Sequence, residues 1–188
     1  MLLTRISSTP TTIVSLADVK TQARVDFSDD DALLSSLILS AVEAVQQRSG
    51  RTLGTEQWTV SYPGVSGDIL LPKSPVQTID AATYYDVNGA QQTLDLGQFY
   101  RWIDEDKAII RPKAAAFWPA TQMREDAISF TFTVGYGANL PEPLKTAIKM
   151  IVSFLYQNRE STMVGRSITQ IPIAADDLID LYRVGWVA

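Results

Sequence analysis

The chain has 188 residues, of which 46% are hydrophobic and 20% charged, as is typical of one folded globular domain, with or without an insertion. It contains no cysteine and no histidine, which excludes disulfides, thiolate or imidazole metal sites, cysteine nucleophiles and Ser-His triads. The formal net charge of −5 argues against a broad basic face that grips nucleic acid, although DNA can still pass nearby without being held.

We expect neither a membrane span nor a leader peptide. The longest apolar runs are shorter than the roughly 18–20 residues that a membrane span requires. The N-terminal stretch MLLTRISSTP has no basic region before a long apolar stretch, as a signal peptide would have. The sequence therefore predicts a protein of cytoplasmic origin.

Residues 1–54 are predicted to supply the N-terminal helices of a helical base. In SLADVKTQARVD, Ser15 is a candidate N-cap, and Asp18 three positions later completes an approximate capping box. The following segment, DFSDDDALLSSLILSAVEAVQQRSGRTL, has apolar residues at helical spacing, is capped by Ser28 or one of the next three aspartates, and ends at Gly50. Its apolar stripe comprises Leu34, Leu37, Ile38, Ala41 and Val45.

Residues 55–137 are predicted to form an inserted antiparallel β unit, because the hydrophobic period changes to two. Alternating apolar residues mark its first and last long strands: Trp58, Val60 and Tyr62, then Ile128, Phe130, Phe132 and Val134. Asn88 and Gly89 predict a two-residue type I′ turn. DILLPKSPV, FYRWID and AIIRP are interpreted as further strands, the last two joined by an acidic turn at residues 104–106.

Residues 138–163 are predicted to form the main C-terminal helix of the base. Pro141 or Pro143 begins it, at a position where a missing N–H costs nothing. Its apolar stripe comprises Leu144, Ile148, Ile151, Val152 and Leu155. The fold class is therefore α+β: a small antiparallel helical base with an inserted antiparallel β unit and an extended C-terminal arm over residues 164–188.

The arm, TMVGRSITQIPIAADDLIDLYRVGWVA, has apolar residues without an obvious place in the base. Ile168, Ile171 and Ile173 alternate as in an extended strand. Residues 175–182 predict two helical turns that expose Leu178, Ile179, Leu181 and Tyr182. So short a helix is marginal in water. It therefore either folds back on its own domain or docks on another chain, and the pattern alone does not decide between the two.

Four stretches carry a family resemblance, in this order: SLADVKTQARVDFSDDDALLSSLILSAVEAVQQRSGRTL, FWPATQ, VGYGANLPEPLKTAIKMIVSFLYQNRE and IPIAADDLIDLYRVGW. Together they resemble the HK97 gp6-like head-tail connector, or adaptor, proteins of long-tailed bacteriophages. The chain is most similar to the longer members with a β insertion, which occur in prophages and gene transfer agents. The resemblance covers most of the chain, whereas residues 55–115 match only in general character.

The resemblance implies a structural protein with no catalysis and no cofactor. Such proteins form a ring, commonly of twelve subunits, beneath the portal protein; the ring extends the DNA channel without specific DNA binding and receives a stopper or tail-completion protein. It implies a location in the bacterial host cytoplasm during assembly and then at the head-tail interface of the virion. It also implies a portal-docking arm with these residues: Ile168, Ile171, Ile173, Leu178, Ile179, Leu181, Tyr182, Arg183 and Trp186. The candidates for ring contacts are Tyr156, Arg159 and Glu160.

Some of these features also have plainer interpretations. Residues 29–31 lack the donor spacing of a calcium loop and are interpreted as a helix cap cluster. Arg159 and Glu160 also fit a solvated helix end. Four aromatic residues of the β unit could form a stacking platform for bases or sugars: Tyr84, Tyr85, Tyr100 and Trp102. Cross-strand packing is the preferred interpretation of them, because Arg101 is the only basic residue among them in the sequence.

Two other functions remain as alternatives. One is a different neck component, such as a stopper or tail-completion protein. The other, less favoured, is a carboxylate-dependent phage glycan hydrolase, which requires two carboxylates roughly 5–9.5 Å apart across a cleft. No pair of carboxylates in the sequence suggests such a site.

Overall fold

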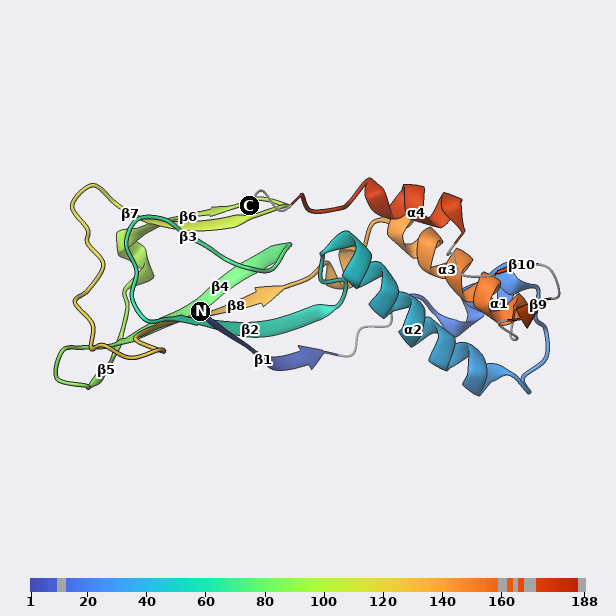
Figure 1. Cartoon of the computed structure of the whole chain (residues 1–188), viewed down its shortest axis with the longest axis horizontal. Coiled ribbons are helices and arrows are strands. Elements are labelled where there is room, and N and C mark those ends of the chain that lie inside the picture. The colour runs from blue at the N-terminus through green and yellow to red at the C-terminus, as the bar shows by residue number, and fades with distance from the viewer. Residues whose placement is uncertain (10–12, 159–161, 164–165, 168–171, 186–188) are drawn as a thin grey trace. The chain divides into compact units, whose positions relative to one another are not determined.

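The computed structural model describes residues 1–9, 13–158, 162–163, 166–167 and 172–185, which belong to two compact units. Met1–Pro10 and Gly54–Tyr136 form the β unit, and Thr11–Leu53 and Gly137–Ala188 form the helical unit (Figure 1). The α+β class predicted from the sequence is confirmed. Within the described ranges, no helix combines the length and the apolar character needed to cross a bilayer.

The helical unit is built around α3, which contacts the other three helices. The helices are α1 (Leu16–Ala23), α2 (Asp31–Ser49), α3 (Glu142–Gln157) and α4 (Ile173–Asp180). Short elements also lie in this unit: η2 (Gly137–Asn139), β9 (Thr162–Met163) and β10 (Arg166–Ser167). The two longest helices, α2 and α3, pack against each other, and the buried residues of their apolar stripes form the core of the unit.

The start of α1 and the end of α2 follow the predicted capping chemistry, but the start of α2 does not. The Ser15 hydroxyl accepts a hydrogen bond from the Asp18 backbone N–H at 3.1 Å, which caps α1. Gly50 ends α2 with φ of 71°, a left-handed conformation that glycine adopts without steric cost. Asp30 holds the N-cap position of α2 but makes no side-chain cap bond.

The β unit contains two antiparallel sheets. The larger sheet has the strand order β1 (Leu2–Thr9), β2 (Thr55–Tyr62), β8 (Ile128–Val134), β4 (Val76–Tyr85) and β5 (Gln91–Thr93). The smaller sheet has the order β3 (Ile69–Leu70), β7 (Ala108–Pro112) and β6 (Phe99–Ile103), and η1 (Leu96–Gln98) precedes β6. One core cluster joins residues from both sheets, among them Phe130 and Phe132 of β8 and Ile110 of β7.

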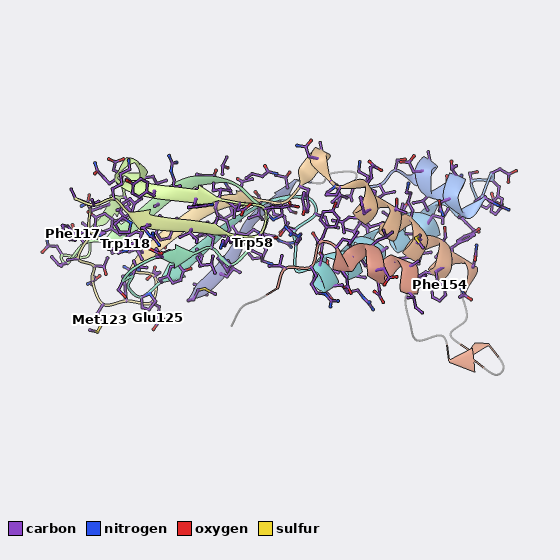
Figure 2. The ribbon with its side chains drawn as sticks, turned by 90° about the horizontal axis from the view of Figure 1, so that it is seen from above. Trp58, Phe117, Trp118, Met123, Glu125 and Phe154 are labelled. Atoms are coloured by element: carbon purple, nitrogen blue, oxygen red, sulfur yellow. The ribbon has the colours of Figure 1, made fainter. Side chains whose placement is uncertain are left out.

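Trp118 packs into this core from the loop that joins β7 to β8. Its ring stacks on Phe99 with centroids 4.5 Å apart, and its indole N–H donates to the Gly67 carbonyl at 2.8 Å. Figure 2 shows Phe117, Trp118 and Met123 at the same end of the β unit. Phe117 and Met123 are exposed, so Trp118 is the member of this group that anchors the loop.

Two local predictions for the β unit and its boundaries are wrong. Residues 1–10 were placed in the helical base, but β1 pairs with β2 at the edge of the larger sheet. The turn at Asn88 and Gly89 is not type I′. A type I′ turn requires positive φ at both residues, but of these two described residues only Gly89 has a positive φ. Instead, the Gly89 N–H donates to the Asp86 carbonyl, and the Asp86 carboxylate accepts from the backbone of Asn88 and Ala90.

Candidate functional site

The part of the chain that the structure describes contains no group of three or more acidic side chains arranged to hold a metal ion. The acidic cluster before α2 makes structural contacts instead. Tyr156 donates to the Asp30 carboxylate at 2.6 Å, and Lys20 pairs with Asp31 at 2.7 Å. These aspartates therefore tie α2 to α3 and α1, as a structural role requires.

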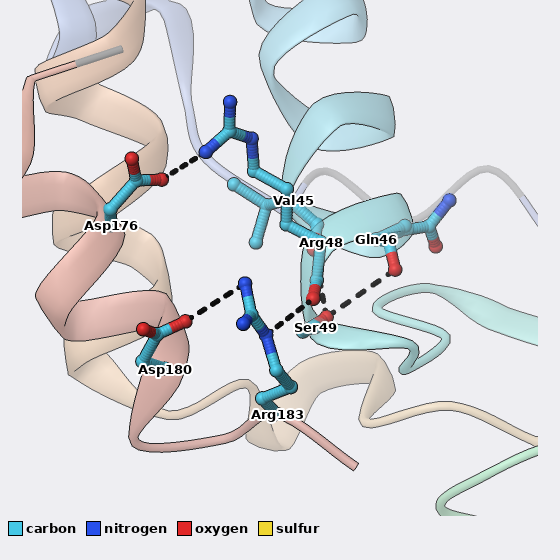
Figure 3. Close-up of polar contacts among 7 residues, drawn as sticks. All are labelled: Val45, Gln46, Arg48, Ser49, Asp176, Asp180 and Arg183. Carbon is cyan, nitrogen blue, oxygen red and sulfur yellow. Dashed lines mark hydrogen bonds and ion pairs between the residues drawn. The ribbon is translucent and has the colours of Figure 1, made fainter. Parts of the chain in front are cut away.

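The C-terminal helix α4 is held to the helical unit by two buried side chains and several polar contacts. Ala175 and Ile179 are fully buried, and α4 contacts α2 and α3. Arg48 of α2 pairs with Asp176, and Arg183 both pairs with Asp180 at 3.0 Å and donates to the Arg48 carbonyl at 3.3 Å (Figure 3). This explains how a helix of eight residues is stable here although it would be marginal alone.

The chain remains attached to α2 beyond the end of α4. The Val184 N–H donates to the Ser49 carbonyl at 2.9 Å, and Arg51 donates to the Tyr182 carbonyl. The Ser49 hydroxyl in turn donates to the Val45 carbonyl at 2.7 Å. Residues 173–184 therefore fold back on their own unit rather than forming an extended arm.

The opposite face of α4 remains exposed. Ile173 is 75% exposed and Leu181 is 71% exposed, and together with Asp177 they lie at spacings of four along the helix. We call these three residues the α4 stripe. The stripe is apolar at both ends and acidic in the middle, which suits a contact with another protein.

The remaining predicted arm and ring residues are distributed differently from the expectation. The prediction that Ile179 is exposed is wrong, because it fills the space between α4 and the other helices. Leu178 and Tyr182 are half-buried, and Arg183 is exposed. Tyr156 makes the internal contact with Asp30. Five predicted residues lie outside the described part of the chain: Arg159, Glu160, Ile168, Ile171 and Trp186.

A second exposed surface, which the sequence analysis missed, lies on the smaller sheet. Directly opposed residues share a face of a sheet, and β7 pairs Ile109 with both Trp102 and Leu70 and pairs Arg111 with Tyr100. These five residues form what we call the hairpin face. Trp102 is 70% exposed, Tyr100 59% and Leu70 52%. The prediction that cross-strand packing covers Tyr100 and Trp102 is therefore wrong. The other two aromatic residues are covered: Tyr84 packs against the core, and the Arg124 guanidinium lies 3.5 Å from the Tyr85 ring centroid.

A hollow of about 720 Å³ lies over the hairpin face. Its described lining includes the basic residues Arg101, Lys107 and Arg111 and the acidic residue Asp104. Arg101 is paired with buried Ile110, so its side chain lies on the face of the sheet opposite Tyr100 and Trp102. Arg111 also pairs with Asp68, and its hydrogen bonds hold the pKa of that carboxyl below its usual value. Because Arg111 is paired with Asp68, and Glu105 and Asp106 follow Asp104 in the turn, the exposed aromatic rings lie beside both basic and acidic groups, with no excess of positive charge.

The sequence of the chain matches the model of one protein family over residues 13–94 and 119–183, and that family is described as phage gp6-like head-tail connector proteins. The chain belongs to this family. It is therefore a structural head-tail connector protein and not an enzyme. The connector's family match includes α1, α2, α3 and α4 but not residues 95–118, which contain β6 and β7.

Solved structures of gene transfer agent (GTA) particles contain chains with the same fold as the connector. The neck of an empty GTA particle computed with C6 symmetry and the virion of a native particle each contain a similar chain, with a TM-score of 0.79 and 21% identity. The neck of a native particle computed with C12 symmetry contains one with a TM-score of 0.76 and 20% identity. In all three, the match covers 100% of this chain and 98% of the other. No curated protein matches the connector.

Proposed function

We propose that this connector forms a closed ring in the neck of a tailed phage or phage-like particle and attaches to the portal protein through the α4 stripe. Support for the ring comes from the family and from the two similar necks, which were computed with sixfold and twelvefold symmetry. The proposed ring has twelve copies, extends the DNA channel and receives a stopper or tail-completion protein. The connector would reach this position in the virion after assembly in the host cytoplasm.

The observation that carries the portal contact is the division of α4 into two faces. Ala175 and Ile179 hold the helix to its own unit, while Ile173 and Leu181 remain exposed. Burial of two such side chains in a partner would contribute about 1.5–3 kcal/mol each. Asp177, between them, would select a basic group on the portal, since complementary charge governs orientation more than affinity. From the predicted arm, the proposal also retains Tyr182 and Arg183, which flank the stripe.

The net charge of the connector fits a channel through which DNA passes without being held. A charge of −5 repels phosphates, whereas specific or tight DNA binding requires clustered basic residues. We therefore propose that the lumen makes no specific DNA contact.

Portal binding by a double variant, Ile173→Ser with Leu181→Ser, tests the proposal. Binding to the cognate portal protein, measured by pull-down and by biolayer interferometry, should fall by at least about tenfold, while the thermal unfolding profile stays unchanged. Leu39→Ser is the matched control, because Leu39 is 72% exposed on a different helix, α2. Wild-type affinity in the double variant would refute the portal contact. Deletion of residues 167–188 is a poorer test, since it also removes buried Ile179.

A further inference from the structure

The turn between β4 and β5 contains a pair of residues that is chemically labile in an unstructured chain. Asn88 and Gly89 form the single Asn-Gly pair of the sequence, and Asn88 is exposed. Asparagine is a thermolabile residue, and it loses its side-chain amide most readily before glycine, which has no side chain to obstruct the reaction. The other two asparagines precede Leu140 and Arg159, whose side chains hinder the same reaction.

Deamidation at this pair begins with the backbone nitrogen of Gly89. After losing its proton to water or hydroxide, this nitrogen approaches the side-chain carbon Cγ of Asn88 to about 3–3.5 Å and attacks it. A bond forms between the two atoms, the bond from Cγ to the side-chain nitrogen breaks, and that nitrogen takes a proton from water and leaves as ammonia. Water then opens the five-membered ring at either carbonyl carbon, and the product is aspartate or isoaspartate.

In the folded connector, the reacting nitrogen of Gly89 is held in another interaction. Its N–H donates to the Asp86 carbonyl at 2.9 Å. The Asp86 carboxylate accepts from the backbone N–H of Asn88 at 2.9 Å and of Ala90 at 3.0 Å, so the backbone on both sides of Gly89 is also fixed. Loss of the Gly89 proton would break its hydrogen bond and create a negative charge close to that carboxylate. The fold therefore opposes the first step of the reaction.

Further contacts hold the turn in this conformation. The Asp86 N–H donates to the Ala90 carbonyl at 2.9 Å, and the Gln92 side chain donates to the Asp86 carboxylate at 3.1 Å. The Gln92 hydrogen bond and those from the backbone keep the pKa of Asp86 below its usual value, so this carboxylate is ionised at neutral pH. A side chain at Gly89 would come within 3.3 Å of the Gln122 amide, which therefore lies against the turn.

We propose that Asn88 is a deamidation site that Asp86 protects, so that it reacts only when the turn between β4 and β5 opens. The observed rate is then the rate in an unfolded chain multiplied by the fraction of time for which the turn is open. β5 has three residues, all exposed, and we expect this end of the larger sheet to open at a lower free energy than its centre.

The product would change the turn that protected it. Isoaspartate lengthens the backbone by one carbon, and aspartate adds a second carboxylate close to Asp86. Either change opposes closure of the turn, so each deamidated chain keeps a permanent record that its turn has opened. This inference concerns the β unit alone and does not depend on the proposed ring or on the portal contact.

Incubation of the wild-type connector at mildly alkaline pH, with and without guanidinium chloride, tests the proposal. Peptide mapping by mass spectrometry follows the loss of the amide at Asn88. We expect the reaction to be at least about tenfold slower in the folded connector than in the denatured chain. Equal rates would overturn the protection by the fold, and no reaction in the denatured chain would overturn the assignment of the site.

Asp86→Ala separates the contribution of the carboxylate. The variant loses the hydrogen bonds to Asn88, Ala90 and Gln92, and its folded-state rate of deamidation should rise by about tenfold, while its rate in guanidinium chloride stays unchanged. Asp95→Ala is the matched control, because the Asp95 carboxylate caps another turn of the β unit by accepting from the Gly97 N–H at 2.8 Å. It should leave the rate at Asn88 unchanged.

A folded Asp86→Ala variant that deamidates at the wild-type rate would overturn the protection by Asp86. The same acceleration in Asp95→Ala would also overturn it, because the effect would then reflect general loosening of the β unit. If Asp86→Ala does not fold, the comparison of the wild-type connector with and without guanidinium chloride still decides whether the fold protects Asn88.

Discussion

The helical unit and the β unit expose apolar residues for different structural reasons. In the helical unit, α4 is a single short helix that lies at the surface, and its two faces divide between the core and the outside. In the β unit, the smaller sheet has apolar residues on both faces, and the core covers the face with Phe99 and Ile110 but not the hairpin face. The α4 stripe is therefore held in place by a few contacts, and the hairpin face by a large core.

This difference indicates how firmly each surface is held. The hairpin is anchored through strand pairing and through residues of the core cluster. The attachment of α4 depends on Ala175, Ile179 and a set of polar contacts with α2. We therefore expect α4 to open locally at a lower free energy than the β unit unfolds.

The largest expected effect comes from the core of the β unit. Phe130 is fully buried, and its ring contacts Trp118 and Tyr62 with centroid separations of 6.0 and 6.5 Å. Phe130→Ala should lower the free energy of unfolding by about 3–5 kcal/mol, because it removes apolar burial and leaves a cavity. Urea denaturation followed by tryptophan fluorescence measures this loss. A cost below about 1 kcal/mol would contradict the assignment of Phe130 to the core cluster that joins the two sheets.

Ile179→Ala should have a smaller and more local effect. Loss of a buried isoleucine costs about 2–5 kcal/mol, and we expect the lower end because α4 lies at the edge of its unit. Hydrogen exchange should accelerate in residues 173–184 and remain unchanged in β8. Leu181→Ala is the control and should change stability by less than about 0.5 kcal/mol, since Leu181 is exposed. Faster exchange throughout the chain would show that α4 does not open separately.

The ion pair between Arg48 and Asp176 should contribute less again. Both side chains are 38% exposed, so water and salt screen the pair, and its coupling energy should be at most about 1 kcal/mol. A double-mutant cycle with Arg48→Ala and Asp176→Ala, read by urea denaturation, isolates this value. The coupling should shrink as salt is added. An undiminished coupling at high salt would mean that packing of the Arg48 stem, rather than charge, holds the helices together.

The sequence predicted the elements whose own periodicity defines a buried face. The apolar stripes of α2 and α3 and the alternation in β8 each mark one face for the core. The structure buries most of each face, with Leu37, Ile38 and Leu155 half-buried. The predicted beginning of α4 is wrong, because Pro172 occupies its N-cap and the helix starts at Ile173 rather than at residue 175. Ile173 therefore belongs to the helix and not to an extended strand.

The surfaces could not be predicted from local pattern, because residues distant in sequence decide what is covered. β1 has no strict alternation, and only its pairing with β2 makes it a strand of the sheet. The alternation in β6 predicted a strand, but it could not show that Trp118 would cover Phe99 while nothing among the described residues would cover Trp102. The same holds for α4, where contacts with α2 and α3 decide that Ile179 is inside and Leu181 outside.

The smallest expected effect concerns Asp80, whose carboxylate joins three strands of the larger sheet. Partial burial raises the pKa of Asp80, but hydrogen bonds from Thr78, Gln57 and Thr133 at 2.6, 3.0 and 2.7 Å outweigh it and hold the pKa below its usual value. The ionised carboxylate therefore stabilises the fold fully above the ordinary pKa of aspartate, and this contribution is lost as the pH falls through the lower folded-state pKa.

Asp80→Asn should consequently be less stable than the wild type at pH 7, by less than about 1 kcal/mol because Asp80 is largely exposed. The two proteins should converge in acid, once the wild-type carboxyl is protonated. Urea denaturation at pH 7 and at several values below pH 5 measures the difference. A difference that persists unchanged in acid would assign the effect to the hydrogen-bond geometry of the side chain. In that case the charge of Asp80 would add nothing to the stability of the larger sheet, and the side chain would act through its shape and hydrogen bonds alone.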